Sequence, residues 1–273
     1  MKSESVFDNI VKEALNGVGQ VVLTGGSSGI GQVFINSIAR VEPCLPICNL
    51  SRHQCGDFGG QLTHYECDFS QVTARAEVFK QLAVDLRQNP AKGRLLLINN
   101  SGFGSYGHFP APDLPTQLGM IEVNISAVVE LTGILLPLLK ERGGAILNVA
   151  STAAFQATPY MATYGATKAF LLSWTLGLNE ELRGSGVSAL AICPGPTRTG
   201  FQIRAGFSDE GFVAKGGQSA EEVVQVSLKA LIRGKVIIVS GLRNRLLAWL
   251  SIHSPKVFGA RIAGRLIRGT RMD

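Results

Sequence analysis

The 273-residue chain lacks the sequence features of membrane-spanning and secreted proteins. Its unbroken apolar runs all stay below the ~18 residues expected of a membrane-spanning helix. Residues 1–19 carry Glu4, Asp8 and Glu13 and no apolar export core, so we predict no secretory signal there. Linkers, internal repeats and low-complexity segments are absent as well. With 45% hydrophobic residues, a chain of this length can bury one large core, which favours a single α/β domain.

Cysteine is scarce too, since the chain has five, an odd number that favours reduced thiols in a cytosol. We therefore predict a cytoplasmic protein. Four of the five cysteines lie near His53 and His64, but their spacing fits no zinc motif. Cys48 and Cys67 fall within expected strands, where cysteine packs as a small apolar residue. We predict no metal site.

Acidic residues are scarce in the C-terminal tail. Of the 26 basic and 20 acidic residues, eight basic ones but only Asp273 among the acids lie from Lys235 onward. The net charge of +6 therefore comes from the tail, and the rest of the chain is near neutral. Residues 241–273 interleave these charges with Trp249 and aliphatic side chains, which predicts a basic amphipathic helical extension.

Three kinds of contact fit such a tail: an anionic membrane surface, the body of the domain, or a second copy of the chain. We predict a peripheral membrane contact through residues 241–273 as one of these alternatives. Nucleic acid is not an expected partner, because no base-reading motif or aromatic stacking platform accompanies the charge.

Short apolar runs alternate with longer helical patterns along the rest of the chain. Strands that are apolar on both faces and alternate with helices predict a parallel sheet covered on both sides, a Rossmann-type doubly wound fold. We expect an N-terminal helix within residues 1–19, the Rossmann-type domain over 20–240 and the extension over 241–273. Thr197 to Gln218 is expected to form an irregular loop. The expected strands are 21–23, 45–50, 95–98, 145–149, 187–192 and 236–239, and the expected helices are 30–40, 73–88, 123–142, 163–183 and 220–232.

A glycine-rich turn follows the first expected strand and precedes a helix. Glycines allow the backbone to turn tightly and to approach a pyrophosphate, while the helix N-terminus directs free N–H groups at the charge. A plain tight turn is the alternative, and the strand–turn–helix context argues against it. The expected phosphate-binding residues are Gly25, Ser27, Ser28, Gly29, Ile30 and Gly31.

The end of the second strand indicates which dinucleotide binds. NAD enzymes tend to have an acid there for the ribose 2′-hydroxyl, whereas this chain has Ser51 followed by Arg52, a planar cation suited to a 2′-phosphate. We predict NADP(H) rather than NAD(H), with a solvated surface arginine as the alternative. Asp68, after the third strand, is expected to contact the adenine or to cap a turn.

Proton-transfer chemistry is indicated by Ser151, Tyr164 and Lys168. Tyr164 and Lys168 lie four apart, so on a helix they share a face. We expect the lysine ammonium and the positive nicotinamide to lower the pKa of the phenol. Ser151 ends a strand, where its hydroxyl can point into a cleft at the carboxyl edge of the sheet. A core tyrosine and a solvated lysine are the alternatives, which their joint occurrence disfavours.

These motifs together resemble the short-chain dehydrogenase/reductase family, in its single-domain NAD(P)(H)-dependent branch. The resemblance runs from roughly Gln20 to Val239 and includes the glycine run, Asn99 to Gly102, Asn124, Ser151, Tyr164, Lys168 and Pro194-Gly195. One departure is Ser101, where the family more often has alanine.

The resemblance implies a role for each matching residue. Ser151 would polarise the substrate carbonyl and Tyr164 would donate the proton. Lys168 would bind the nicotinamide ribose and tune Tyr164, and Asn124 would anchor a water-linked proton relay. The remaining cofactor contacts implied are Asn100, Pro194, Gly195, Thr197 and Thr199. Family geometry would also place four apolar side chains near the substrate, Phe103, Phe155, Met161 and Phe201.

The function predicted from the sequence is NADPH-dependent reduction of an apolar ketone or aldehyde to an alcohol, or the reverse oxidation. The alternatives are a catalytically silent dinucleotide sensor or scaffold, and a membrane-surface lipid or sterol dehydrogenase. A sugar epimerase is disfavoured by the glycine spacing and the chain length. The resemblance implies a homodimer or homotetramer paired through the helices at 123–142 and 163–183.

Overall fold

The computed structural model describes residues 2–56, 59–88, 91–207 and 217–268. Within them, seven strands form one sheet in which all neighbours are parallel. The strand order is β3-β2-β1-β4-β5-β6-β7, so the direction of winding reverses between β1 and β4. This sheet confirms the predicted doubly wound fold. The strands are β1 Val18–Thr24, β2 Ile47–Ser51, β3 Leu62–Glu66, β4 Arg94–Asn99, β5 Gly144–Val149, β6 Val187–Cys193 and β7 Ile237–Val239.

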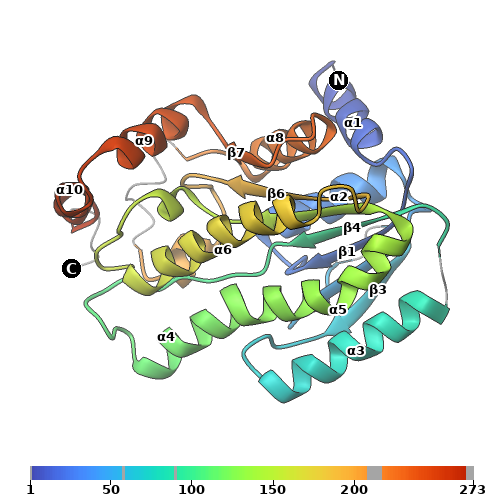
Figure 1. Cartoon of the computed structure of the whole chain (residues 1–273), viewed down its shortest axis with the longest axis horizontal. Coiled ribbons are helices and arrows are strands. Elements are labelled where there is room, and N and C mark those ends of the chain that lie inside the picture. Colours follow the sequence, from blue (N-terminus) through green and yellow to red (C-terminus); the bar gives the residue numbers. More distant parts are fainter. Residues whose placement is uncertain (1, 57–58, 89–90, 208–216, 269–273) are drawn as a thin grey trace.

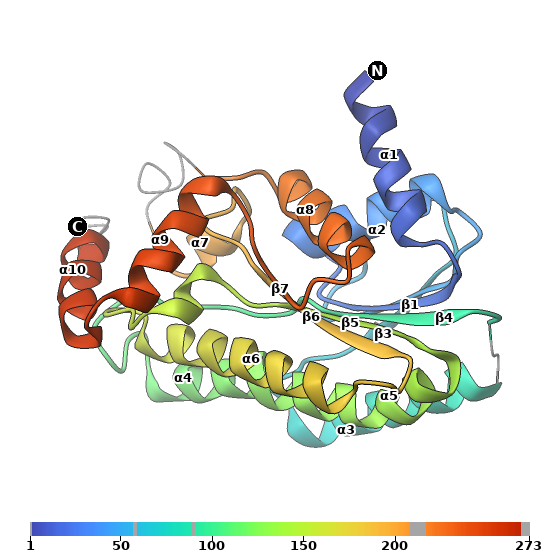
Figure 2. The same cartoon turned by 45° about the horizontal axis from the view of Figure 1, so that its top comes forward.

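Helices cover both faces of the sheet, as Figure 2 shows with the sheet close to edge-on. One face carries α1 (Lys2–Ala14), α2 (Gly29–Val41) and α8 (Ala220–Ile232). The other carries α3 (Val72–Gln88), α5 (Ala127–Arg142) and α6 (Ala162–Glu181). Figure 1 shows the same elements in another orientation, with α9 and α10 at the end of the molecule away from α1.

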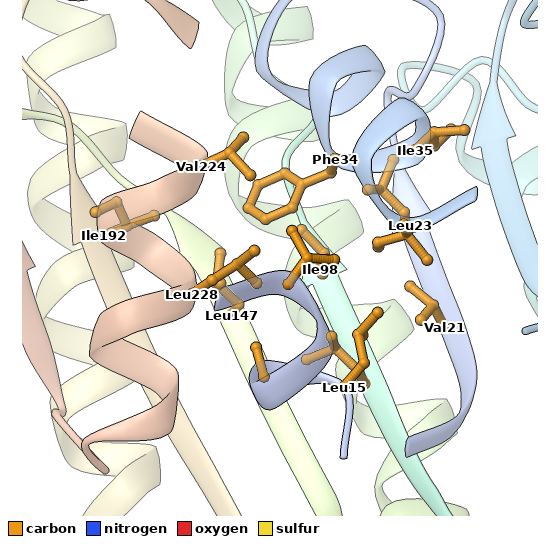
Figure 3. Packing of buried hydrophobic residues seen from close by; sticks show 14 of the residues in the cluster. Leu15, Val21, Leu23, Phe34, Ile35, Ile98, Leu147, Ile192, Val224 and Leu228 are labelled. Atoms are coloured by element: carbon orange, nitrogen blue, oxygen red, sulfur yellow. The ribbon is translucent and has the colours of Figure 1, made fainter. Parts of the chain in front are cut away.

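Two hydrophobic cores result from the alternation of side chains along each strand. Val21 and Leu23 of β1 face the helices α1, α2 and α8, whereas Val22 between them faces α3 and α5. Figure 3 shows the first core, in which Phe34 of α2 packs with Val224 of α8 above β1 and β4. Burial on both faces explains why the central strands read as continuous apolar runs.

Two elements differ from the sequence-based expectation. The sequence did not delimit β3, because this edge strand mixes Leu62, His64 and Glu66 and none of its residues is buried. The helix expected from Val123 begins earlier, at Leu114, where Asp113 Oδ1 accepts the Thr116 N–H at 2.7 Å. Helix α4 (Leu114–Ile121) runs through a π-helical turn, Glu122–Ser126, into α5.

The continuous helix Leu114–Arg142 could cross a membrane if length and apolar composition alone decided. The sequence analysis missed this, because it considered only unbroken apolar runs. A buried core helix meets the same criterion, and here Leu131, Leu135 and Leu139 pack between α3 and the sheet. We therefore treat this segment as a core helix.

The C-terminal extension forms two helices, α9 (Leu242–His253) and α10 (Lys256–Arg268), where the sequence pattern predicted one. Pro255 explains the break, because it lacks an N–H and disfavours helical backbone at Ser254, which is extended at φ −85° and ψ 146°. The expected loop 197–218 contains a short helix, α7 (Phe201–Arg204), and its ends meet in a bridge between Thr197 and Gln218. Its residues 208–216, and residues 269–273 of the extension, lie outside the described chain.

Candidate active site

The glycine turn after β1 has a backbone that other residues would not fit. Gly25 has a φ of +74°, and a Cβ there would lie 2.7 Å from the Ser101 hydroxyl. A Cβ on Gly31 would lie 2.2 Å from the Gly25 carbonyl oxygen. The first turn of α2 therefore packs directly on the turn. Ser28, the cap residue of α2, makes no side-chain capping hydrogen bond within the described residues, so the helix N-terminus is free to bind an anion.

Two asparagines, the buried Asn49 and the half-buried Asn100, hold this turn in place. Asn49 of β2 accepts the Gly26 N–H at 2.9 Å and donates to the Ser51 hydroxyl at 2.9 Å. Asn100, directly after β4, donates to the carbonyl oxygens of Thr24 and Gly25 at 3.0 and 3.1 Å. The Thr24 hydroxyl in turn accepts the Asn100 N–H at 2.9 Å. The ends of β1, β2 and β4 are thus tied together at the point where the strand order reverses.

The end of the site where the sequence predicts the adenosine contains Ser51, Arg52 and Asp68. The Ser51 hydroxyl donates to the His53 carbonyl at 2.7 Å, and Arg52 is exposed. Asp68 accepts both the N–H and the hydroxyl of Ser70, at 2.9 and 2.7 Å. Burial acts to raise the pKa of Asp68, but these hydrogen bonds and the positive charge of Arg52 outweigh it and lower the pKa. Asp68 therefore caps a turn and faces Arg52 across this end.

Ser151 and Tyr164 meet at the carboxyl edge of β5. Ser151 follows the strand and caps the 3₁₀ turn Thr152–Phe155, its hydroxyl accepting the Ala153 N–H at 3.1 Å. Burial raises the pKa of Tyr164 to about 12, and a hydrogen bond with Ser151 opposes this shift. At neutral pH the phenol is held protonated, as a proton donor must be.

Lys168 lies one helical turn from Tyr164 and is buried with it. Its Nζ donates to the Val149 carbonyl at 2.8 Å and lies 5.9 Å from the centre of the Tyr164 ring. Burial lowers the pKa of Lys168 from 10.5 to about 8. The sequence analysis expected Lys168 and the nicotinamide to lower the pKa of Tyr164, and for the site with cofactor bound this stays a prediction. In the protein alone the pKa of Tyr164 is shifted upward, because the loss of water around the phenol dominates its environment.

Asn124 sits in the π-helical turn, where its side-chain amide makes three hydrogen bonds to the protein. Its Nδ2 donates to the Phe103 carbonyl and the Thr167 hydroxyl, both at 3.0 Å. Its Oδ1 accepts the Phe103 N–H at 3.1 Å. A Cβ on Gly102 would lie 3.1 Å from Asn124 Oδ1 and 3.2 Å from Lys168 Nζ. Asn124 therefore fixes the segment after β4 beside Lys168, and π-turns recur at functional sites for this kind of local adjustment.

One cleft of about 1330 Å³ joins these groups. The strands β1, β4, β5 and β6 each end just before a segment that lines it. Most of the predicted site residues line this cleft. Gly31 and Asn124 do not line it but lie directly behind the residues that do. The predicted residues that line it are Gly25, Ser27, Ser28, Gly29, Ile30, Ser51, Arg52, Asp68, Asn100, Phe103, Ser151, Met161, Tyr164, Lys168, Pro194, Gly195, Thr197, Thr199 and Phe201.

Phe155 is the exception among the predicted substrate residues. It does not line the cleft, because the 3₁₀ turn directs it into the core cluster that contains Val128 and Leu171. The other apolar residues converge as expected. Phe201 lies 5.3 Å from Tyr164 between ring centres, and a Cβ on Gly104 would meet Phe201, Tyr164 and Met161 within 3.3 Å.

A family model described as short chain dehydrogenase matches residues 20–207, well over half of the chain. The chain belongs to the short-chain dehydrogenase family. The matched segment contains the glycine turn, Ser151, Tyr164, Lys168 and the residues after β6. The C-terminal helices α9 and α10 lie beyond it.

Named relatives support the same family. This short-chain dehydrogenase is 40% identical over 201 residues to serine 3-dehydrogenase of Rhizobium radiobacter, covering 70% of this chain and 78% of that one. It is 33% identical over 194 residues to the ketoacyl reductase HetN of Nostoc sp., covering 67% of this chain and 65% of that one. A crystal structure of a short-chain dehydrogenase from Burkholderia cenocepacia in complex with NADP superposes with a TM-score of 0.73 at 25% identity. That match covers 89% of this chain and 96% of the other.

Two polar residues of this short-chain dehydrogenase site escaped the sequence analysis. A polar residue inside the apolar run of β2 could have signalled Asn49. Asn244 of α9 lines the cleft and donates to the Ser240 carbonyl at 2.8 Å and to Gln218 at 3.3 Å. Its side chain also packs closely against the backbone of Gly195, where a Cβ would lie 2.3 Å from Asn244 Nδ2. No local pattern marks Asn244, since its partners come from distant segments.

The buried lysine generates a prediction about stability. The pKa of Lys168 is about 8 in the folded protein and 10.5 as the ordinary value, so between these pH values the unfolded chain holds the extra proton. Stability therefore rises with pH across this window, and the cost of burying the charge is fully present below pH 8. Lys168→Met changes the free energy of unfolding of the cofactor-free protein by a different amount at each pH. We expect this change to be more favourable at pH 7 than at pH 10.5 by about 1–3 kcal/mol.

Urea unfolding of both proteins at the two pH values measures this difference, and comparison across pH cancels the lost hydrogen bond to Val149. Lys80→Met, on the exposed side of α3, is the matched control and should show no such pH dependence. Parallel stability–pH curves for Lys168→Met and the unaltered protein would contradict the prediction.

Proposed function

We propose that this protein reduces a ketone or aldehyde to an alcohol with NADPH, and that the same site supports the reverse oxidation. The observation that carries the proposal is the buried, protonated Tyr164 beside Ser151, in the cleft that also contains the free N-terminus of α2. A pure dinucleotide sensor would gain nothing from burying a tyrosine and a lysine at such a place, since both groups are costly to ionise there.

The residues present fit a nicotinamide dinucleotide. A Cβ at Gly25 or Gly31 would collide with neighbouring atoms, and the first turn of α2 presents free N–H groups where a pyrophosphate would bind. When bound, the nicotinamide supplies the hydride. The segment Pro194, Gly195, Thr197 and Thr199 would surround the nicotinamide ring, and Lys168 would hold its ribose.

The protein's own part in the reaction is to orient the carbonyl and to provide a proton. Ser151 would donate a hydrogen bond to the carbonyl oxygen, which becomes negative as the hydride arrives. The Tyr164 hydroxyl would then give its proton to that oxygen. The charge of Lys168 would stabilise the tyrosinate left behind, and Asn124 would anchor the water-linked relay that returns the proton.

NADPH is the proposed cofactor because of Ser51 and Arg52. No acid stands at the end of β2 to bind a ribose 2′-hydroxyl, and Arg52 offers a guanidinium at the rim of the cleft. Asp68 faces Arg52, but its carboxylate is already engaged by Ser70. The Burkholderia cenocepacia relative holds NADP in its crystal structure, which agrees with this choice.

The proposed substrate is apolar. Phe103, Met161 and Phe201 line the cleft close to Tyr164. Further from Tyr164 the lining continues with side chains of α9 and α10, which are Leu247, Ala248, Leu250, Ile262, Ala263 and Leu266. An apolar lining with a few polar groups at one end suits an apolar molecule that carries a single carbonyl.

The proposed assembly is a homodimer or homotetramer. Helices α5 and α6 leave Val129, Phe170 and Leu176 more than one third exposed, and pairing with a second copy would bury them. The cytoplasmic location and the contact of residues 241–273 with a membrane surface are proposals as well.

Removal of the Tyr164 hydroxyl tests the proposed proton donor. We expect Tyr164→Phe to lower kcat for an apolar ketone by about 10²- to 10⁴-fold, the usual contribution of a general acid, while the Kd for NADPH stays within about twofold. NADPH consumption and NADPH fluorescence titration measure the two quantities. Tyr160→Phe, a nearby tyrosine outside the cleft lining, is the control. Equal loss of turnover and of NADPH binding would refute the role.

Reversal of the charge at the adenosine end tests the proposed cofactor. We expect Arg52→Asp to reduce the preference for NADPH over NADH, measured as a ratio of kcat/KM values, by about tenfold to a hundredfold. Arg87→Asp, at the exposed end of α3, changes the net charge equally and should leave the ratio unchanged. An unchanged ratio in Arg52→Asp would show that the guanidinium does not contact the 2′-phosphate.

A further inference from the structure

The C-terminal helix pair, α9 and α10, has ten exposed large apolar side chains, of which four also line the cleft. Within the described residues of both helices, the buried ones are Ala248 and Ala263. Trp249 is 57% exposed and Val257 68% exposed. A helix that only packs on its own domain has the opposite arrangement, with the large residues inside. The other exposed apolar residues are Leu242, Leu246, Leu247, Leu250, Ile252, Phe258, Ile262 and Leu266.

The helix pair is nevertheless attached to the body of the protein. The Ser251 hydroxyl donates to Gln156 Oε1 at 2.9 Å, and the Tyr106 hydroxyl donates to the Ile267 carbonyl at 3.3 Å. Gly264 faces Pro159, since a Cβ there would lie 3.3 Å from the proline ring. Small residues therefore form the inner contact, and Figure 2 shows α10 at the far end of the molecule with its outer side uncovered.

The same outer surface is strongly basic. Between Leu242 and Arg268 the sequence contains six lysines and arginines and no acidic residue. All six are exposed, and none takes part in an ion pair within the described part of the chain. The six are Arg243, Arg245, Lys256, Arg261, Arg265 and Arg268. Exposed apolar side chains, a tryptophan and unpaired cations on two short helices match an anionic lipid surface in both hydrophobicity and charge.

The active-site cleft opens onto this surface. Leu247, Leu250 and Leu266 line the cleft, and each is also at least 45% exposed. The apolar lining near Tyr164 is thus continuous with the apolar outer face of the helix pair. A molecule with an apolar chain could move from a bilayer into the cleft along this lining with little of that chain entering water.

We propose that the outer face of α9 and α10 lies on an anionic lipid bilayer, and that the cleft takes an apolar carbonyl substrate directly from that bilayer. The second part rests on the proposed carbonyl reductase activity, whereas the first part stands on the surface alone. A second copy of the chain is a poorer occupant for this face. An isologous contact would bring six cations of each copy together with no acidic residue from either helix pair between them.

Flotation of the full chain with vesicles tests the surface. The vesicles are phosphatidylcholine alone, or phosphatidylcholine mixed in equal parts with phosphatidylglycerol. We expect binding to the mixed vesicles only, and at least about tenfold weaker binding by the double variant Arg261→Glu/Arg265→Glu. The matched control is Lys80→Glu/Arg87→Glu, which reverses two exposed charges on α3 and should bind like the unaltered protein. Binding should also shift the tryptophan emission to shorter wavelength, and the shift should be lost in Trp249→Phe.

Turnover in the same vesicles tests the route of the substrate. Arg261 and Arg265 do not line the cleft, so Arg261→Glu/Arg265→Glu should retain its Kd for NADPH and its kcat/KM for a short water-soluble ketone. Its kcat/KM for a long-chain ketone supplied in the mixed vesicles should fall at least about tenfold, in proportion to the lost binding.

The outcomes separate the two proposals. Absence of flotation, or flotation that the charge reversal leaves unchanged, would overturn the membrane surface even if ketones are reduced. Loss of a dimer on charge reversal, seen by analytical ultracentrifugation in the absence of lipid, would assign this face to a second copy and overturn the proposal as well. Flotation with no turnover of any ketone would overturn the proposed function and the substrate route, and would leave the surface itself supported.

Discussion

The site depends on one close approach, that of the glycine turn to the first residues after β4. The Gly25 backbone touches Ser101, and the Asn100 side chain reaches back to the carbonyls of Thr24 and Gly25. Since β1 and β4 are the neighbours at which the winding of the sheet reverses, this contact closes the floor of the cleft. The N-terminus of α2, where an anion is predicted to bind, and the segment that leads to Asn124 are both positioned by it.

The second constraint is electrostatic. Tyr164 and Lys168 are both buried. Burial raises the pKa of Tyr164 and lowers that of Lys168, so it favours the neutral form of each group. For Tyr164, burial therefore favours the protonated phenol that can donate a proton. For Lys168, the buried positive charge lowers the free energy of unfolding. The Val149 carbonyl offsets part of that cost through its hydrogen bond to Nζ. A bound nicotinamide ribose would offer further partners, so the site is arranged for a loaded state rather than for maximal stability of the empty protein.

Much of this could be predicted from the sequence, because several requirements are local. A glycine turn between a strand and a helix, and a tyrosine four residues before a lysine, carry their geometry in their spacing. The direction of the Tyr164 pKa shift could not be predicted in this way, because it depends on how completely other segments cover the phenol. Asn49 and Asn244 were missed for a related reason: their hydrogen-bond partners are brought to them by tertiary packing. Phe155 was misplaced because one 3₁₀ turn decides whether it faces the cleft or the core. The helix break at Pro255 could have been predicted from the sequence. Which face of α9 and α10 packs on the body of the protein could not.

The π-helical turn at Glu122–Ser126 confines the effect of a length change to the turn itself. It holds one more residue than an α-helical turn, so a single deletion within it would restore an α-helical turn and leave the two flanking stretches in nearly the same relative orientation. Asn124 would then leave Phe103 and Thr167, whereas the cleft-lining face of α4 with Leu118 would keep its direction. A single deletion in the regular part of α4 or α5 would instead rotate one part of the helix by about 100° relative to the other. The extra residue of the π-turn is therefore what allows Asn124 to reach Phe103 and Thr167 without turning the rest of the helix.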